Sequence, residues 1–307
     1  MKPTRWPAVI VIVAAMWASA RAWGDTGSLA GRLQLTLDLD RYAWSSGEYV
    51  PKALVSFTNV SAESIIFDRP TADSWDERTY NGNQWVIVTA SDGQPVPSDG
   101  PIIVERRPGT EWIPTVTLAP EESHAYMTSL ILWGYYLPGL SLSPGLYTVQ
   151  AVYEYFDVPR PIFDDADEEK QWIGENHQLL FSNVVPLEVL EQGAKAPERV
   201  KLARDGTPAP DALPRMIVRG HLMADARVFK DSGADISKSE GSATINRGEK
   251  SVTLPVGRWP KEIQDKHPPA IPCIGGGLLV PVRYVAESLG MKVTWDPKTQ
   301  TANILTG

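Results

Sequence analysis

The sequence predicts a mostly β protein in which a β-sandwich is followed by a smaller α+β domain built from two repeated half-units. A length of 307 residues suggests about two domains. The 26 prolines and 24 glycines favour short strands joined by turns over long helices. Apolar and polar residues alternate in the first half, and a pattern of helix and strands recurs in the last third.

The sandwich is expected to span residues 27–191. Leu33, Leu35, Leu37 and Leu39 alternate with polar residues, and a period of two indicates a half-buried strand. Turn residues separate this run from similar ones, and the absence of a credible helix fits an immunoglobulin-like sandwich. The other strand-like runs are 49–58, 64–67, 85–89, 112–118, 123–132, 146–155 and 184–190.

Several motifs of the sandwich region carry a resemblance to a known family. They are Gly47-Glu48, Val55–Glu63 (VSFTNVSAE), Asp92-Gly93, Leu118–Ser123 (LAPEES) and Pro144–Val149 (PGLYTV). On these motifs, residues 33–153 resemble the BsuPI-like proteinase-inhibitor family, an immunoglobulin-like domain, although Glu121 stands where that family usually has Gly. The resemblance implies protease inhibition through sandwich loops, and the 95–109 loop with Arg106-Arg107-Pro108-Gly109 suits a trypsin-like protease; an ordinary solvated loop is the alternative.

The second domain is expected at 198–307, after a linker at 192–197 that lacks apolar periodicity. Pro281 suits a first helical turn and Gly290 a left-handed helix end, which predicts a helix near 282–289. A hairpin follows at 292–305. The pattern also occurs 56 residues upstream, where Val218–Phe229 aligns with Ile274–Val285 and Gly233 with Gly290. In the first copy, Asp225 and Lys230–Ser232 depart from the pattern, so its helix is expected to be shorter or absent.

The last third of the chain contains the motif Val-Pro-x-Arg-x-x-x-Glu-x-Leu-Gly-x-x-Val-x-Trp-Asp at 280–296. With this motif, Pro197–Gly307 resembles the copper amine oxidase N-terminal-like domain, the stalk domain of bacterial envelope proteins. In that family the stalk is an appendage, and the chemistry belongs to a separate catalytic domain with a tyrosine-derived cofactor and clustered histidines. This chain has no such tyrosine motif, and its histidines, His124, His177, His221 and His267, lie far apart in sequence. We therefore expect no copper, no other cofactor and no enzymatic activity.

Residues 1–22 resemble a signal peptide, with Lys2 and Arg5 before an apolar run at 8–20 and small residues at a cleavage site near Ala22. The run is too short for a comfortable membrane span, although a retained anchor is the alternative. We expect a soluble extracytoplasmic protein without a membrane span, secreted or held non-covalently at the cell surface. A formal charge of −8 without a basic run argues against nucleic-acid binding.

Two clusters are candidate ligand sites. The first is an acidic loop, a weak calcium candidate, for which a solvated loop is the favoured alternative. The second is an aromatic set that suits a glycan platform, with ordinary packing as the alternative. The calcium candidates are Asp164, Asp165, Asp167 and Glu168, and the aromatic candidates are Trp133, Tyr135, Tyr136 and Trp172.

Other reactive side chains are expected to be structural. Ser123 and His124 are adjacent on a strand and point to opposite faces, and Cys273 lies in an apolar stretch. Four residues of the 280–296 motif are also expected to be structural: Arg283, Glu287, Trp295 and Asp296. The Trp295 ring is expected to cover the apolar face of the helix at Val285 and Leu289. The favoured function is a non-catalytic envelope protein that binds or scaffolds another protein or a polysaccharide; protease inhibition, glycan binding and an unrecognised enzyme remain alternatives.

Overall fold

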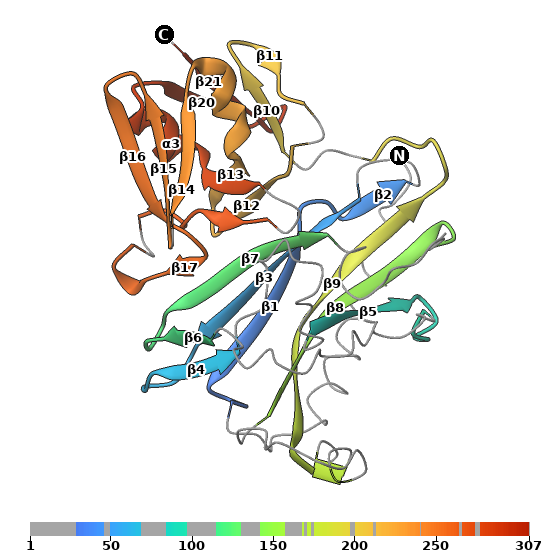
Figure 1. The fold of residues 1–307 in the computed structure, drawn as a ribbon. Helices are drawn as coiled ribbons and strands as arrows, with labels where there is room; N and C mark the ends of the chain where they lie inside the picture. Colours follow the sequence, from blue (N-terminus) through green and yellow to red (C-terminus); the bar gives the residue numbers. More distant parts are fainter. Residues whose placement is uncertain are drawn as a thin grey trace.

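The chain is described here by a computed structural model (Figure 1). Strands dominate it, and helix α3 (Val282–Ser288) lies within the segment expected to be helical. Gly290 follows this helix with a φ of 78°, the left-handed conformation predicted for it. The predicted class, mostly β with a smaller α+β region at the end, is confirmed. The structure describes residues 29–45, 50–68, 84–96, 115–129, 142–156, 168, 171–172, 175–196, 200–210, 213–239, 241–263, 266–273 and 277–306.

Two facing sheets form the sandwich, with a small strand pair beside them. Neighbouring strands are antiparallel, except that the second-sheet strand at Ala43–Ser45 runs parallel to its neighbour. The first sheet contains, in order, β1 (Leu33–Leu39), β3 (Lys52–Asn59), β7 (Ser123–Ser129) and β17 (Arg258–Trp259). The second contains β2 (Ala43–Ser45), β9 (His177–Leu190), β8 (Gly145–Phe156) and β5 (Gln84–Ala90). The pair is β4 (Ile65–Asp68) with β6 (Thr115–Leu118).

Apolar and polar residues alternate along β1, and this alternation places its apolar side chains in the sandwich core. Its four leucines are buried, and the residues between them are more exposed. An aromatic group fills the centre of the core, where the Phe57 ring lies 5.1 Å from both Phe67 and Tyr153. The Tyr153 contact is edge-to-face, an arrangement that stabilises aromatic pairs beyond the area that they bury. Because these rings come from both sheets and from β4, packing joins the layers without a disulfide.

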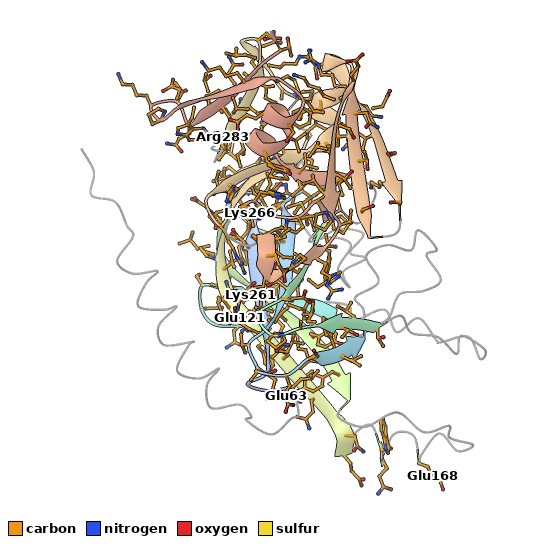
Figure 2. All side chains as sticks on the ribbon, turned by 90° about the vertical axis from the view of Figure 1, so that its left-hand side faces the viewer. Glu63, Glu121, Glu168, Lys261, Lys266 and Arg283 are labelled. Carbon is orange, nitrogen blue, oxygen red and sulfur yellow. The ribbon has the colours of Figure 1, made fainter. Side chains whose placement is uncertain are left out.

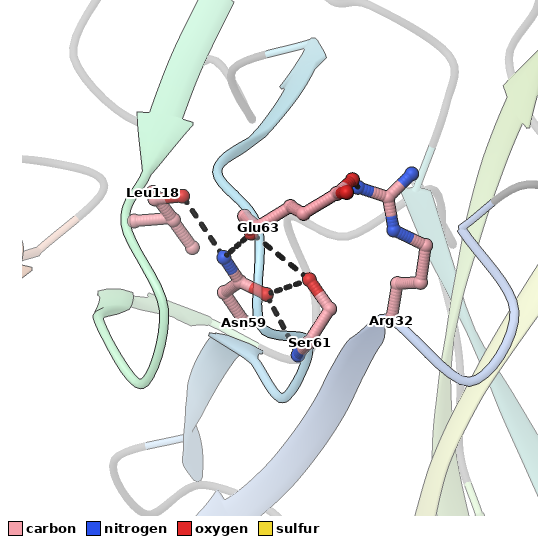
Figure 3. Close-up of polar contacts among 5 residues, drawn as sticks. All are labelled: Arg32, Asn59, Ser61, Glu63 and Leu118. Atoms are coloured by element: carbon pink, nitrogen blue, oxygen red, sulfur yellow. Dashed lines mark hydrogen bonds and ion pairs between the residues drawn. The ribbon is translucent and has the colours of Figure 1, made fainter.

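The corner after β3 is organised by the fully buried amide of Asn59 (Figure 3). Its Nδ2 donates to the carbonyl oxygens of Glu63, at 2.8 Å, and Leu118, at 3.0 Å. Its Oδ1 accepts from the backbone N–H and the hydroxyl of Ser61, at 2.9 and 2.7 Å. Arg32 reaches the Glu63 carboxylate at a longer 3.5 Å (Figure 3). One side chain thus ties the ends of β3 and β6 to the start of β4.

Replacing Asn59 with alanine should lower the free energy of unfolding by roughly 2 kcal/mol, because the buried Leu118 carbonyl loses this donor and the Ser61 N–H loses its acceptor. Asn59→Asp is the matched variant, since it keeps the acceptor for Ser61 but loses both donated bonds. Urea unfolding followed by tryptophan fluorescence measures both. If Asn59→Ala stayed within about 0.5 kcal/mol of wild type, the typical range of neutral surface changes, the network would not hold this corner.

The second domain, residues 200–306, which we call the stalk after the domain that it resembles, contains two hairpins around a four-stranded sheet (Figure 1). The central sheet contains, in order, β12 (Arg215–Val218), β13 (His221–Asp225), β19 (Leu278–Pro281) and β18 (Ile271–Pro272). The first hairpin belongs to the sheet β14 (Asp235–Ser239), β15 (Ser242–Arg247) and β16 (Lys250–Pro255). The second belongs to the sheet β11 (Thr207–Pro208), β10 (Lys201–Arg204), β21 (Thr301–Leu305) and β20 (Lys292–Asp296). Two 3-10 helices are η1 (Ala226–Ser232) and η2 (Lys261–Ile263).

The two half-units meet about a local twofold axis between β13 and β19. Met223 pairs with Pro281, and Asp225 pairs with Leu279. Leu279 is the counterpart of Met223 in the second half-unit, 56 residues later, and Pro281 is the counterpart of Asp225, so the two pairs are equivalent. Ala224 pairs with its own counterpart, Val280, on the axis. The following hairpin strands, β14 and β20, begin 57 residues apart, at Asp235 and Lys292. The third strands break the symmetry, because β16 joins β15 antiparallel and β10 joins β21 parallel.

The first half-unit was expected to have a shorter helix or none, but it has a 3-10 helix, η1, of seven residues, the same length as α3. Asp225 is buried, and its carboxylate accepts from the Arg227 backbone N–H at 2.9 Å and from the Arg227 guanidinium at 2.9 and 2.8 Å. A side chain that accepts from the second residue of a helix is an N-cap. Pro281 occupies the equivalent place before α3 and makes no side-chain cap. The two halves therefore start their helices by different means.

The sandwich and the stalk share an apolar core at their junction. β17 leaves the stalk and extends the first sandwich sheet, with Arg258 opposite His124 and Trp259 opposite Ser123 on β7 (Figure 1). Met127 of β7 also forms a parallel bridge with Cys273. The buried cluster at this place draws residues from both units: Leu54, Ala125, Met127, Met216, Val218, Met223, Trp259, Ile271, Cys273 and Leu279. Apolar packing therefore crosses the sequence boundary.

Two ion pairs also join the sandwich to the stalk. Glu122, which is mostly buried, accepts from the Arg258 guanidinium at 2.6 Å and from the Ala119 backbone N–H at 2.9 Å. Glu121 lies beside Lys261, with 2.6 Å between carboxylate and ammonium (Figure 2). The φ of Glu121 is 66°, a left-handed conformation that favours glycine. In this chain, the position carries a contact to the stalk.

Part of the expected linker is held against the sandwich. Ala194 N donates to the Glu191 carbonyl at 3.0 Å, which forms a turn, and Gly193 has a φ of 82°. The Ser45 hydroxyl donates to the Glu191 carbonyl at 3.0 Å and accepts from Gly193 N at 3.2 Å. This segment has no regular secondary structure, in keeping with its sequence, but its backbone is tied to β2.

Candidate ligand groove

Most of the residues proposed as ligand sites lie outside the described residues. They are Trp133, Tyr135, Tyr136, Asp164, Asp165, Asp167 and the Arg106–Gly109 loop. Glu168 is described and exposed, and the Trp172 carbonyl accepts from the Asn176 side chain at 2.9 Å. Among the described residues, no group of three or more His, Cys, Asp or Glu side chains is placed to hold a metal ion. The calcium and glycan-platform predictions therefore stay predictions.

The side chains expected to be unreactive are buried where the structure describes them. The Ser123 hydroxyl lies 2.9 Å from the Thr58 hydroxyl across the β3–β7 pair. His124 is buried beside Gly257, whose backbone has a left-handed φ of 71°. Cys273 is buried in the junction core, and this burial raises the pKa of its thiol from 9.0 to about 12. The prediction of a buried cysteine is confirmed, and the thiolate needed for nucleophilic chemistry is strongly disfavoured.

We expect the Cys273 thiol to resist iodoacetamide at pH 8 in the folded protein and to react fully once guanidinium unfolds the chain. The reason is that alkylation needs the thiolate and access to it, and the fold withholds both. Mass spectrometry after timed quenching measures the modified fraction. Alkylation of the folded protein at the unfolded rate would show that the junction opens readily.

Three of the four hairpin-motif residues have the structural contacts expected of them. Arg283 Nε lies 3.9 Å from the Glu287 carboxylate, one helical turn away, and both side chains are exposed. Such pairs contribute only a few tenths of a kcal/mol. The Asp296 carboxylate accepts from the Thr299 hydroxyl at 2.7 Å and from Lys298 N at 2.9 Å. These bonds, the Thr299 bond first, lower the pKa of Asp296.

Trp295 differs from the expectation. Its ring was expected to be buried over the stripe of Val285 and Leu289, but Trp295 is 39% exposed and lies outside the buried core cluster that contains these two residues. It lines a groove with Val293, which precedes it by two residues on the same face of β20. The groove has a volume of about 390 Å³, within the range of small-molecule sites. The lining residues are Ile217, Gly220, His221, Leu222, Pro281, Val282, Arg283, Tyr284, Val293, Trp295 and Ala302.

The rim of the groove combines aromatic and cationic groups. The Tyr284 ring stacks on the buried His267 ring, with 3.8 Å between the centroids, and Tyr284 remains 38% exposed. Partial burial, and secondarily the nearby His267, lower the pKa of His221, which favours the neutral form of its imidazole. His267 Nδ1 lies 2.9 Å from the Pro268 carbonyl oxygen, which fixes its orientation. Arg283, the second residue of α3, also lines the groove; it is labelled in Figure 2.

The sequence did not identify this groove as a site. Its members come from β12, β13, α3, β20 and β21, which meet only because β13 pairs with β19 and the second hairpin packs beside α3. The available signal was the mismatch between the two half-units at His221, Tyr284 and Trp295. Chemically, the groove offers two aromatic surfaces, an imidazole and a guanidinium over an apolar floor, which suits binding.

Comparison with protein families supports the assignment of the stalk. Residues 204–303 match the family model of the copper amine oxidase N-terminal domain. A comparison with curated proteins finds no match to the chain. Within the described residues, no helix has the length and apolar character needed to cross a membrane. The match covers most of the stalk and leaves the sandwich outside it, so the resemblance of residues 33–153 to the BsuPI-like family stays a prediction.

Proposed function

We propose that the chain is a non-catalytic extracytoplasmic binding protein in which the sandwich and the stalk act as one scaffold. The observation that carries this proposal is the junction. A strand of the stalk completes a sandwich sheet, and an apolar cluster lies between the two units. Domains joined by a linker alone move independently by default, whereas an apolar interface fixes their relative orientation. A fixed orientation suits a protein that presents surfaces to partners.

Other observations support the same proposal. The stalk domain of the matching family is an appendage to a separate catalytic domain, and the signal-like segment at 1–22 favours export. The groove on the stalk provides a surface for a ligand. The protease-inhibitor alternative depends on Arg106–Gly109, and a panel of trypsin-like proteases would test it directly. If one of these proteases were inhibited, the partner would be a protease, and the proposal that the two units form one scaffold would still hold.

Cosedimentation with insoluble cell-envelope polysaccharide tests the proposed function. The chain without residues 1–22 should enter the pellet with saturable binding, and an excess of unlabelled protein should displace the labelled protein. Peroxide release from primary amines, measured in parallel, should stay at the background rate. Protein that remains in the supernatant at every concentration, or that turns over amines, would contradict the proposal.

A further inference from the structure

Residues that line the groove have counterparts at equivalent positions of the other half-unit, so the two sets can be compared within one molecule. At the floor, the two halves carry identical or closely similar apolar side chains, all of which pack in or against the stalk core. An apolar floor is therefore what this fold requires at these places. The pairs are Leu222 with Leu278, Val293 with Ile236, and Ala302 with Ala243.

The rim residues differ completely between the halves. The pairs are His221 with Gly277, Tyr284 with Val228, and Trp295 with Lys238. In the first half, the Lys238 ammonium donates to the Gly277 carbonyl oxygen at 3.1 Å. The same fold is thus built with glycine, valine and lysine where the groove has histidine, tyrosine and tryptophan. The fold therefore does not require aromatic side chains at these positions, which suggests that they serve binding.

The arginines of the two halves also differ in their partners. Arg227 makes a bidentate contact with the buried carboxylate of Asp225. Its counterpart, Arg283, has Pro281 in place of that carboxylate. The Arg283 side chain is 65% exposed, and its contact to the exposed Glu287 is a long 3.9 Å. One half therefore pairs its arginine, whose side chain is 51% exposed, with a buried carboxylate, and the other presents its arginine at the groove with only a long contact to an exposed one.

We propose that this groove binds an acidic sugar unit of a polysaccharide, a pyranose ring that carries a carboxylate. A pyranose offers a flat C–H face that packs on an electron-rich aromatic ring, and Trp295 and Tyr284 supply such rings. Arg283 supplies the guanidinium that pairs with a carboxylate, and the His221 imidazole supplies a hydrogen-bonding group. The proposal deepens the proposed function and rests on it.

Charge favours an acidic ligand over a neutral one. The protein is acidic, with 37 Asp and Glu against 29 Lys and Arg, yet no lining residue of the groove is a carboxylate. The ionisable lining side chains are Arg283, His221 and Tyr284. An acid-free groove with an arginine on an acidic surface is complementary to a localised negative charge. An acidic peptide shares that charge but lacks the flat apolar ring face beside it.

Titration calorimetry with defined oligomers tests this proposal. The probes are a galacturonate hexamer, a neutral maltose-series hexamer and a hexaglutamate peptide, all at pH 7 and low salt. We expect binding of the galacturonate hexamer alone, with Trp295→Ala weakening it by about tenfold or more and Trp295→Phe restoring most of it. Arg283→Gln should weaken it by several-fold and reduce its salt dependence. Tyr42→Ala, an exposed aromatic on the sandwich, is the matched control and should leave the affinity unchanged.

Thermal melts of each variant separate lost binding from lost folding. Equal binding of the neutral hexamer, or galacturonate binding that Trp295→Ala leaves intact, would overturn the acidic-sugar groove. Hexaglutamate binding that depends on Trp295 would replace the sugar with a peptide and overturn it too. If the wild type bound none of the three probes but still sedimented with envelope polysaccharide, the acidic-sugar groove would be wrong and the proposed function would stand. If it also failed to sediment, both the groove proposal and the proposed function would be wrong.

Discussion

Replacing Trp259 with alanine should lower the free energy of unfolding by roughly 3–5 kcal/mol, the range measured for large aromatic residues removed from cores. Trp259 is 3% exposed in the core between sandwich and stalk, and the Arg219 guanidinium lies 4.1 Å from its ring centroid. Its removal opens a cavity at the junction without touching the main core of either unit. We therefore expect the wild type to unfold in one transition and Trp259→Ala to unfold in two, one for each unit.

Two variants control this result. Trp259→Phe keeps a ring and removes an indole N–H that is buried without a hydrogen-bond partner, so its effect should stay within about 1 kcal/mol. Trp295→Ala truncates an exposed tryptophan and should also have a small effect on stability. Urea unfolding, followed by fluorescence and by circular dichroism, measures all three. Equal stability of Trp259→Ala and Trp295→Ala would mean that the junction contributes nothing.

The Asp40 carboxylate should make the protein less stable as the pH rises from about 4 to about 6. Burial raises its pKa from 3.8 to about 6, against the opposing effects of the Lys52 N–H at 2.8 Å and the Arg41 guanidinium at 3.9 Å. Above pH 6, both the folded and the unfolded states carry the charge, and the fold bears the full cost, roughly 2–3 kcal/mol. Below pH 4, both states are protonated at this residue, and the cost disappears.

Asp40→Asn should accordingly raise the free energy of unfolding by roughly 2–3 kcal/mol at pH 7.5 and by little at pH 4, since the amide oxygen still accepts from Lys52. The difference between variant and wild type removes the contribution of other titrating groups. Glu249→Gln, at an exposed carboxylate in the turn after β15, controls for the loss of one negative charge. A difference that does not change between pH 4 and pH 7.5 would show that Asp40 is not penalised by burial.

Local patterns predicted the parts of the fold that depend on local chemistry. The period of two at Leu33–Leu39 predicted β1, and the proline before and glycine after the helix predicted α3. The 56-residue repeat predicted two half-units. The departure at Asp225 suggested a shorter or absent first helix, whereas the structure has a 3-10 helix of the same length as α3. Each of these signals acts within a few residues or compares like with like, so no knowledge of the tertiary structure is needed to interpret them.

Features that depend on distant partners were not predictable in the same way. β17 is two residues long, too short for any periodicity, and it exists because β7 offers an open edge. The exposure of Trp295 depends on what covers one face of β20, and its strand pattern alone fits burial equally well. His221 and His267 are neighbours only through the packing of the central sheet and α3. The junction and the groove are both products of tertiary packing.

The most direct test of the account is the set of tryptophan indole N–H signals in a nitrogen–proton correlation spectrum of the protein without residues 1–22. Trp295→Phe and Trp259→Phe assign two of the signals. On addition of the galacturonate hexamer, the Trp295 signal should shift progressively to saturation, while the Trp259 signal in the junction core should stay in place. Contradiction would come from a Trp295 signal that does not move at saturating ligand, because the protein would then bind elsewhere or not at all.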